Sequence, residues 1–383
     1  MRFLDWSALK SSKSSLKFRQ NRRKIDGSDL LLSSLEPDGP RKVYLGPVRQ
    51  LTRYTLVETA RETNLSFEIS KAMRRFVQPE LNTNVAQLGA AGYIPPRKSH
   101  LSEMLLACLR FPAALRGLVE ADVVAERDVL TRFMLPHKTA FYASFVHGVL
   151  FLEEVHGPGA PYDSAAIHRR RGFLRACTEL YAQGQPAPNP RAQYTMHSVV
   201  ARQLNGLNLL VSGGVDCIKY EYSGNPGSYM QLVNRPLRDG KYLIRPKVWK
   251  EWYLRAHLMG IRSLYLGLID EAGVLRSTRQ LATRSLPGAA AAKAGAAWDP
   301  EENLRWAFRV LTALRDYCQE ATDRLAVMAP SATRPVWRVE ISPLDGETRV
   351  LVRELAMGER GRLQMSTSRL VPTPVINAYE SYA

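Results

Sequence analysis

The sequence predicts an α+β fold with a mixed β-sheet in one large domain, and three observations lead to this prediction. The chain has 383 residues, of which 45% are hydrophobic and 23% charged, an ordinary globular composition that suffices for one large or two medium domains. Helical and strand patterns alternate irregularly and do not form regular βαβ units. No stretch rich in Pro and Gly divides the body of the chain, so we expect a single domain over residues 41–360.

The part of that domain before residue 221 contains one clear helix and two strand regions. Apolar residues recur at helical spacing over 100–110, after the candidate cap Ser99, which predicts a helix that packs on the core. Segments 141–153 and 207–220 are rich in β-branched, aromatic and leucine residues that are interrupted by glycines. This composition predicts strands that turn back on themselves.

The second half gives sharper boundaries. A helix over 248–259 should end at Gly260 and lead into a buried strand over 263–269. Asp299 can cap a helix and Pro300 fits the first helical position, so a long helix should begin there.

The remaining segments of the domain predict a hairpin and a loop. Segments 336–341 and 349–355, joined across Asp345 and Gly346, should form a closing hairpin. The run of alanines and glycines at 288–297 predicts a flexible loop.

The two ends of the chain lack this patterning. Residues 1–40 form a basic arm, whose first 25 residues hold eight Lys or Arg against the single acid Asp5. Clustered charge with few apolar residues predicts that the arm is mostly disordered. It suits a solvated extension, a nuclear-import or RNA-contacting segment, or a mitochondrial transit peptide. Residues 361–383 are expected to form a loose C-terminal tail.

The charge and the missing motifs narrow the functional class. The formal net charge of +17 indicates attraction to polyanions such as RNA, DNA or acidic lipid. The four cysteines lie far apart, which argues against a zinc module or a disulfide framework: Cys108, Cys177, Cys217 and Cys318. No apolar run approaches the roughly 18–20 residues of a membrane-spanning helix, so no membrane partner is expected. Walker, dinucleotide-binding, zinc-protease and serine-hydrolase motifs are absent.

One acidic residue stands at a position where metal chemistry is common. Asp216 follows the apolar strand pattern that ends in Ser212–Val215, and residues 229–233 form the next strand. An acid at a strand end beside a second strand is the geometry in which metal-dependent nucleases hold a divalent ion. Strand-end aspartates also cap turns or pair with arginine, so both interpretations stay open.

The order of these segments resembles the DXO-type decapping nuclease family, which includes the nuclear partner of the 5′-to-3′ exoribonuclease. The resemblance runs from about residue 43 to residue 355 and rests on segments 121–127, 148–154, 207–217, 229–233, 249–273 and 298–300. It implies two mixed β-sheets that form a central cleft flanked by helices. It also implies hydrolysis of aberrant RNA 5′ ends with a divalent metal, Mg²⁺ or Mn²⁺.

Most of the acidic residues in the family motifs are replaced in this chain. The second motif falls on 172–176 and places Ala176 where a glutamate is expected, and the third falls on 214–216, with Gly214 in place of the other glutamate. The fourth falls on 231–233, where Gln231 and Val233 replace a glutamate and a lysine.

The resemblance assigns roles to the residues that match. Asp216 and the backbone carbonyl of Leu232 would be the metal ligands, while Asp216, Gln231 and Val233 would occupy the catalytic motif positions. Arg127, Arg175 and Arg255 would bind substrate. Further cations border the same segments: residues 168–171, Arg245, Lys247, Lys250 and Arg262. The tryptophans at 249, 252 and 306 are expected in the core.

Three hypotheses follow. With three of the four expected carboxylates replaced, the leading one is a protein that binds RNA 5′ ends or a protein partner, such as a nuclear 5′-to-3′ exoribonuclease, with impaired or lost hydrolysis. The alternative is an active decapping enzyme or pyrophosphohydrolase rebuilt around Asp216, with a substitute acid from Glu153, Glu154, Glu179 or Glu221. The third is a purely structural subunit. We expect a nuclear location, with mitochondria and the cytoplasm as alternatives.

Overall fold

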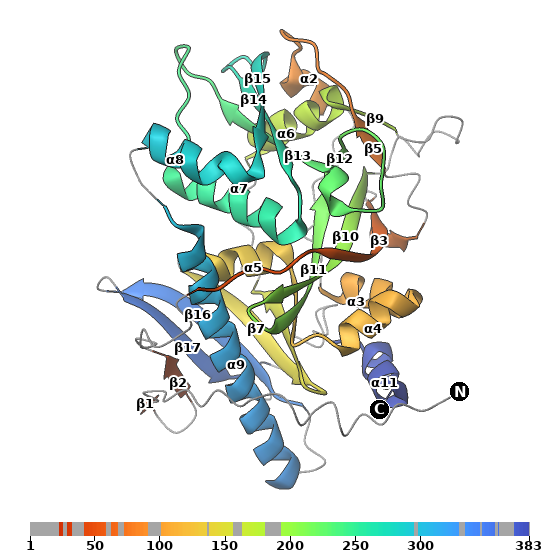
Figure 1. Ribbon diagram of the computed structural model, residues 1–383, viewed down its shortest axis with the longest axis vertical. Helices are drawn as coiled ribbons and strands as arrows, with labels where there is room; N and C mark the ends of the chain where they lie inside the picture. Colours follow the sequence, from red (N-terminus) through yellow and green to blue (C-terminus); the bar gives the residue numbers. More distant parts are fainter. Residues whose placement is uncertain are drawn as a thin grey trace.

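The computed structural model describes residues 23–25, 29–32, 42–58, 63–67, 73–90, 101–135, 138–155, 163–180, 193–294, 298–328, 334–344, 347–356, 359 and 371–382. Within these residues the chain forms two mixed β-sheets with helices packed against them (Figure 1). This arrangement confirms the α+β fold with two mixed sheets.

The larger sheet contains eleven of the described strands, in the order β1-β2-β17-β16-β7-β8-β6-β11-β10-β3-β4. The sheet is mixed. Strand β6 runs parallel to both of its neighbours, β8 and β11, whereas the other neighbouring strands of the sheet pair antiparallel. Its strands are β1 (Arg23–Ile25), β2 (Asp29–Leu32), β3 (Arg49–Glu58), β4 (Thr63–Ser66), β6 (Val123–Glu126), β7 (Thr139–Val146), β8 (Val149–Glu154), β10 (Gln193–Leu204), β11 (Leu207–Val215), β16 (Val336–Leu344) and β17 (Glu347–Glu354).

The smaller sheet contains six described strands, in the order β15-β14-β13-β12-β5-β9. The pairs β12–β5 and β13–β14 are parallel, and the others are antiparallel. Its strands are β5 (Arg74–Phe76), β9 (Thr178–Leu180), β12 (Cys217–Ile218), β13 (Tyr229–Pro236), β14 (Ser263–Ile269) and β15 (Leu275–Ala282). The chain passes from one sheet to the other through a single residue, Asp216, between β11 and β12.

The sharp turns explain why glycines interrupt the strand patterns. Asn205 and Gly206 join β10 to β11 with φ values of 45° and 99°, which suit a two-residue hairpin turn. His147 and Gly148 do the same between β7 and β8, with φ values of 48° and 85°. The strand reversal predicted within 141–153 is therefore confirmed. The reversal predicted within 207–220 is wrong, because β11 continues through Gly213 and Gly214 and the chain then passes into β12 of the smaller sheet.

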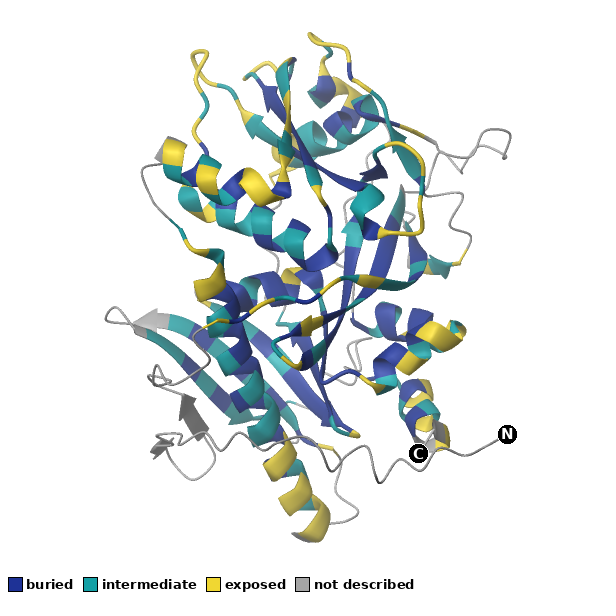
Figure 2. Ribbon diagram, viewed as in Figure 1, coloured by how far each residue is buried: buried dark blue, intermediate teal, exposed yellow. Residues whose placement is uncertain are grey.

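The described helices are α2 (Val85–Ala90), α3 (Leu101–Arg110), α4 (Pro112–Val119), α5 (Arg127–Met134), α6 (Ser164–Ala176), α7 (Pro246–Met259), α8 (Leu286–Ala294), α9 (Pro300–Met328) and α11 (Thr373–Tyr382). Helices α5, α7 and α9 share the largest hydrophobic cluster with strands of both sheets. Helix α9 runs beside β7 and β8, and its last turns are exposed (Figures 1 and 2). No helix in the described part of the chain is both long enough and apolar enough to cross a bilayer.

Several predicted boundaries are confirmed. Helix α7 ends at Gly260, whose φ of 72° is the left-handed conformation that terminates helices. Helix α9 begins at Pro300, and the Asp299 carboxylate accepts a hydrogen bond of 2.9 Å from the Glu301 amide. Strands β16 and β17 form the closing hairpin. The turn at 345–346 and the candidate cap Ser99 lie outside the described residues.

The prediction of a flexible loop at 288–297 is wrong, because residues 286–294 form helix α8. Alanine has the highest intrinsic helix propensity, and Leu286 and Ala290 are buried in the main core beside α7. A run of small residues therefore produces a helix here because one of its faces is covered. Residues 295–297 lie outside the described part.

The ends of the chain are more structured than the sequence predicts. In the C-terminal segment, α11 buries Val375 and Tyr379 against α3 and α4, and the Tyr379 hydroxyl donates a 2.7 Å hydrogen bond to the Leu118 carbonyl. Within the basic arm, β2 pairs with both β1 and β17 at one edge of the larger sheet. The other residues of 1–40 lie outside the described part of the chain.

Candidate functional site

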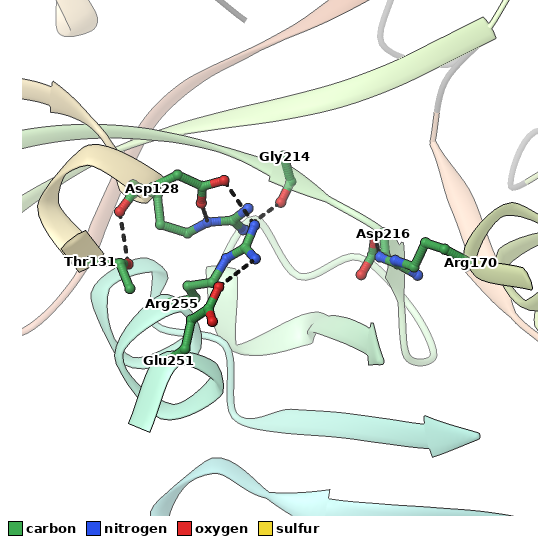
Figure 3. A network of polar contacts seen from close by, with 8 residues as sticks. Asp128, Thr131, Arg170, Gly214, Asp216, Glu251 and Arg255 are labelled. Atoms are coloured by element: carbon green, nitrogen blue, oxygen red, sulfur yellow. Dashed lines mark hydrogen bonds and ion pairs between the residues drawn. The ribbon is translucent and has the colours of Figure 1, made fainter. Parts of the chain in front are cut away.

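Asp216 lies where the two sheets meet, and both of its carboxylate oxygens are engaged. Oδ1 accepts a hydrogen bond of 2.6 Å from Nη2 of Arg170, on α6, and Oδ2 accepts one of 2.8 Å from the Leu232 amide on β13 (Figure 3). The Asp216 side chain is 19% exposed. The alternative in which Asp216 pairs with an arginine is therefore confirmed.

Helix α6 brings Arg170 to Asp216 because it packs closely against α2. A Cβ atom on Gly172 would overlap the carbonyl oxygen of Val85, and one on Gly89 would overlap the carbonyl oxygen of His168. The two backbones approach so closely only because both positions lack a side chain. The glycine that opens the second motif thus positions the helix that carries Arg170.

A second network joins α5, α7 and the end of β11. Asp128 accepts hydrogen bonds from Arg127 Nε at 3.0 Å and from Arg255 Nη2 at 2.9 Å. Arg127 also donates from Nη1 to the Gly214 carbonyl at 2.8 Å, and Arg255 lies 3.6 Å from Glu251 (Figure 3). Two of the three predicted substrate-binding arginines therefore lie together, and one of them, Arg127, contacts Gly214, which precedes Asp216 by two residues in the chain.

The bridging carboxylate is strongly stabilised in its charged form. Burial acts to raise the pKa of Asp128, but the neighbouring guanidinium groups of Arg127 and Arg255 lower it well below its usual range. Burial lowers the pKa of Arg255, and the nearby Arg127 acts in the same direction. Sequence reasoning missed Asp128 as a bridge because its partners come from helices more than 120 residues apart.

The third predicted substrate-binding arginine lies elsewhere. Arg175 donates a 2.8 Å hydrogen bond to the Leu88 carbonyl on α2. It is five residues from Arg170 on the same helix, so the two side chains leave α6 in different directions. The structure thus places Arg175 at the helix–helix contact. Trp249 and Trp252 are buried, as predicted, and the partly buried Trp306 packs against the same core.

Three motif positions beside Asp216 carry neutral groups. Gly214 has room for a side chain, since a Cβ there would lie 3.7 Å from Thr195 and 3.8 Å from the His197 ring. Gln231 is buried on β13, and its Oε1 has no hydrogen-bond partner. Val233 lies in the main core.

Ala176 is the remaining motif position, where the family resemblance implies a glutamate. It is the last residue of α6 and packs against the small cluster that contains Phe173 and Cys177. All four cysteines are buried and free.

These residues do not fit a divalent cation of the kind that the resemblance implies. Mg²⁺ and Mn²⁺ prefer several oxygen ligands, usually carboxylates, whereas Asp216 is a single carboxylate already bound to a guanidinium. Within the described residues, no three His, Cys, Asp or Glu side chains gather as a metal site would require. The backbone carbonyl of Leu232 alone would not replace the missing carboxylates.

The substitute acids considered from the sequence are held elsewhere. Glu154 pairs with Arg132 and Glu179 with Arg75. Glu153 is buried on β8, in the larger sheet, and Glu221 lies beyond β12. None of them joins Asp216 in a described cluster.

A pH dependence of stability follows from two buried histidines. Burial lowers the pKa of His197 to about 3, helped by Arg127, and burial lowers that of His257 to about 4, helped by Arg202. The unfolded chain therefore binds more protons than the native chain below about pH 6.5, so the free energy of unfolding should fall as the pH drops. Each histidine contributes at most about 1.4 kcal/mol per pH unit in this window.

Urea unfolding at pH 7, 6 and 5 would measure this slope, with H197Q/H257Q as the comparison. The double variant should lose most of the dependence between pH 7 and pH 5. Asp128 does not interfere, because its stabilising charge is lost only below its ordinary pKa of 3.8. An equally steep slope in the double variant would contradict this assignment.

Solved structures that resemble this one include Rai1 proteins. The structure of S. pombe Rai1 has a TM-score of 0.68 at 16% identity and covers 86% of this chain and 100% of that one. Candida albicans Rai1 in complex with pU5-Mn²⁺ has a TM-score of 0.69 at 13% identity and covers 90% and 97%. The fold is therefore that of the Rai1 nucleases.

Sequence comparison identifies the family. Residues 48–373 match the family described as RAI1 like PD-(D/E)XK nuclease, and the chain belongs to that family. A curated relative, decapping nuclease RAI1 of Cryptococcus neoformans, is 24% identical over 248 residues, which make up 57% of this chain and 61% of the relative. The aligned region thus spans less than two thirds of that relative.

Proposed function

We propose that this chain binds the 5′ ends of RNA and that its metal-dependent hydrolysis is impaired. The observation that carries the proposal is the pairing of Asp216, the one carboxylate kept from the family motifs, with the guanidinium of Arg170. A guanidinium therefore already binds the carboxylate that would be the main metal ligand in the alternative hypothesis.

Electrostatics favour this interpretation. A divalent ion about 4 Å from one carboxylate gains roughly 8 kcal/mol of gross Coulomb energy at an effective dielectric constant of 20, and a guanidinium at that distance gains about half as much. The ion must displace Arg170 and also lose part of its hydration shell, which Mg²⁺ does reluctantly. With neutral residues at 176, 214 and 231, no further carboxylate offsets those costs.

Several features support RNA as the ligand. The chain carries a net charge of +17, and phosphate contacts require only fixed cations. Lys250, on α7, lies over the ring of Trp298, and Arg235, on β13, lies over the ring of Trp252 on α7, so two cations lie at this helix. Candida albicans Rai1, which shares the fold, was solved with pU5-Mn²⁺.

Binding of RNA should depend steeply on salt. If four to six phosphates are contacted, the logarithm of the affinity for single-stranded RNA should fall with the logarithm of salt concentration with a slope of about −3 to −4. Fluorescence anisotropy between 50 and 300 mM KCl would measure the slope. A slope near zero, or no binding at 50 mM KCl, would favour a purely structural subunit.

A hydrolysis assay with the same purified chain tests the proposal that its metal-dependent catalysis is impaired. Incubation with 5′-triphosphate, NAD-capped and unmethylated-cap RNA in Mg²⁺ or Mn²⁺ should give no product above that of D216A. Product formed by the wild-type chain and abolished by D216A would instead establish an active enzyme rebuilt around Asp216.

A further inference from the structure

We infer that Arg202, together with Tyr253 and His257, forms a second anion-binding site, which takes a phosphate group. The site is separate from the junction of the two sheets. Arg202 pairs with Leu209 in the β10–β11 ladder, and Leu209 precedes Gly214 by five residues. About 16 Å of strand therefore lies between this site and the candidate functional site, and the inference does not depend on the proposed function.

Arg202 is a buried cation without a counter-ion. Among the described residues two arginines are buried, Arg127 with 8% exposure and Arg202 with 7%. Arg127 donates hydrogen bonds to Asp128 and to the Gly214 carbonyl. Arg202 forms no hydrogen bond or ion pair with any described residue. Buried charges are normally paired because their desolvation is costly, so we expect an anion from solution to complete this site.

The Arg202 side chain points toward helix α7. Alternate residues of a strand share a face, so Arg202 lies on the same face of β10 as Val200 and Leu204. Both of those residues belong to the core cluster that includes α7, and Tyr253 of α7 packs against that cluster. Burial lowers the pKa of Arg202 to about 10, and the charge of Arg202 adds to burial in lowering the pKa of His257. The guanidinium therefore lies close to the face of α7 that carries Tyr253 and His257.

This face of α7 leaves the terminal nitrogens of Arg202 accessible. Lys250, Tyr253 and His257 are spaced by three and four residues, so they share one face of the helix. The rings of Tyr253 and His257 stack with centroids 5.0 Å apart, and Trp298 meets Tyr253 edge-on at 5.2 Å. All three rings are only partly buried. Nε of Arg202 is covered, whereas Nη1 and Nη2 remain in contact with solvent, so an anion can reach them without displacing the covered edge.

The donors around this position suit a phosphate group. The planar guanidinium can donate to two phosphate oxygens at once. Within the described residues the Tyr253 hydroxyl and the His257 ring form no hydrogen bond, so each can donate to a further oxygen. A carboxylate offers only two oxygens for these donors, whereas a phosphate offers three or more. Asp299 and Glu301 affect the pKa of Tyr253, but both are paired with Arg305.

A cation that is buried to bind a ligand should reduce stability when the ligand is absent. Methionine in place of Arg202 has a similar length, removes the desolvation penalty and leaves no carboxylate unpaired. We therefore expect R202M to unfold at the same urea concentration as the wild-type chain, or at a higher one, in buffer without phosphate. An arginine with a structural role would give the opposite result.

The test is urea unfolding of the full chain with and without inorganic phosphate, at constant ionic strength. Phosphate should raise the midpoint of the wild-type chain, because a ligand that binds only the native state stabilises it. R202M should bind phosphate at least about tenfold more weakly, as expected for the loss of a charge-assisted hydrogen bond, and its midpoint should not change. The matched control is R279M, because Arg279 is exposed on β15 of the smaller sheet; it should respond to phosphate as the wild-type chain does.

A conservative second variant keeps the test valid if R202M does not fold. Y253F removes one hydroxyl from a partly exposed side chain and should weaken phosphate binding roughly threefold. A response to phosphate that is unchanged in both R202M and Y253F would overturn the inference. The same would follow if phosphate failed to stabilise the wild-type chain and R202M bound RNA as the wild-type chain does.

Anisotropy titrations with single-stranded RNA that carries a 5′ hydroxyl distinguish the two sources of the phosphate. Weaker binding of this RNA by R202M, but not by R279M, would identify the ligand as a phosphate of the RNA backbone. Unchanged RNA binding by R202M, with the response to inorganic phosphate lost, would identify it as a free phosphate or a small phosphorylated molecule. If no RNA bound to the wild-type chain, the proposed function would fail, and the unfolding experiment would still decide the present inference.

Discussion

Substitution of Gly172 by alanine is expected to lower the free energy of unfolding by about 2–3 kcal/mol, because it inserts a methyl group into a helix–helix contact with no free space. The added Cβ would overlap the Val85 carbonyl and would approach the backbone of Gly89. Helices α2 and α6 must then separate, and several backbone atoms must move together.

The displacement should also affect the candidate site. Helix α6 carries Arg170 two residues before Gly172, so a shift of the helix weakens the contact with Asp216. We therefore expect G172A to bind single-stranded RNA more weakly in addition to being less stable. Urea unfolding monitored by tryptophan fluorescence measures the first effect, and the anisotropy assay measures the second.

G288A is the control for the loss of a helical glycine. Gly288 lies on α8, and a Cβ at that position meets no atom within 4 Å. Alanine should be neutral there or should stabilise the chain by up to about 1 kcal/mol through helix propensity. If G172A and G288A had the same stability, the close approach of α2 and α6 would not be what holds Arg170 in place.

Introducing two carboxylates beside Asp216 should create a metal affinity that we expect the wild-type chain to lack. The variant R170A/G214E/Q231E removes the resident guanidinium and supplies two acids beside Asp216. Gly214 has only ordinary van der Waals neighbours along its Cβ direction, and Gln231 already has the shape of glutamate. Adding two carboxylates should raise the affinity for Mn²⁺ by at least about 100-fold, since each added charge strengthens the attraction by several kcal/mol before desolvation.

Isothermal titration of Mn²⁺ measures this gain. R170A/G214Q is the matched control, because it frees Asp216 and adds a side chain of the same size without charge. It should bind Mn²⁺ only weakly. Equal affinities in the two variants would show that carboxylate number does not limit metal binding at this position.

The fold was predictable where side-chain pattern alone decides the structure. The start of α9 at Asp299 and Pro300 depends on local capping chemistry, and the end of α7 at Gly260 depends on a backbone conformation that glycine adopts readily. Helix α8 was not predictable, because its helical form depends on a neighbouring helix that covers Leu286 and Ala290. The same reasoning applies to α11, which is ordered by contacts with α3 and α4.

The candidate site was predictable only in part. Its motif positions could be placed along the chain, and pairing of Asp216 with an arginine was one of two open interpretations. The identity of that arginine could not be read from spacing, because Arg170 and Asp216 are 46 residues apart and are brought together by the packing of α6. Asp128 was missed for the same reason, since its bridge to Arg255 exists only after α5 and α7 have packed.

The central claim is that a guanidinium has replaced the metal at Asp216. Titration of Mn²⁺ into the wild-type chain and into D216A, followed by electron paramagnetic resonance of the free ion, tests it most directly. We predict indistinguishable titrations, because Asp216 in the wild-type chain is already bound to Arg170. A Mn²⁺ site in the wild-type chain that disappears in D216A would contradict the account.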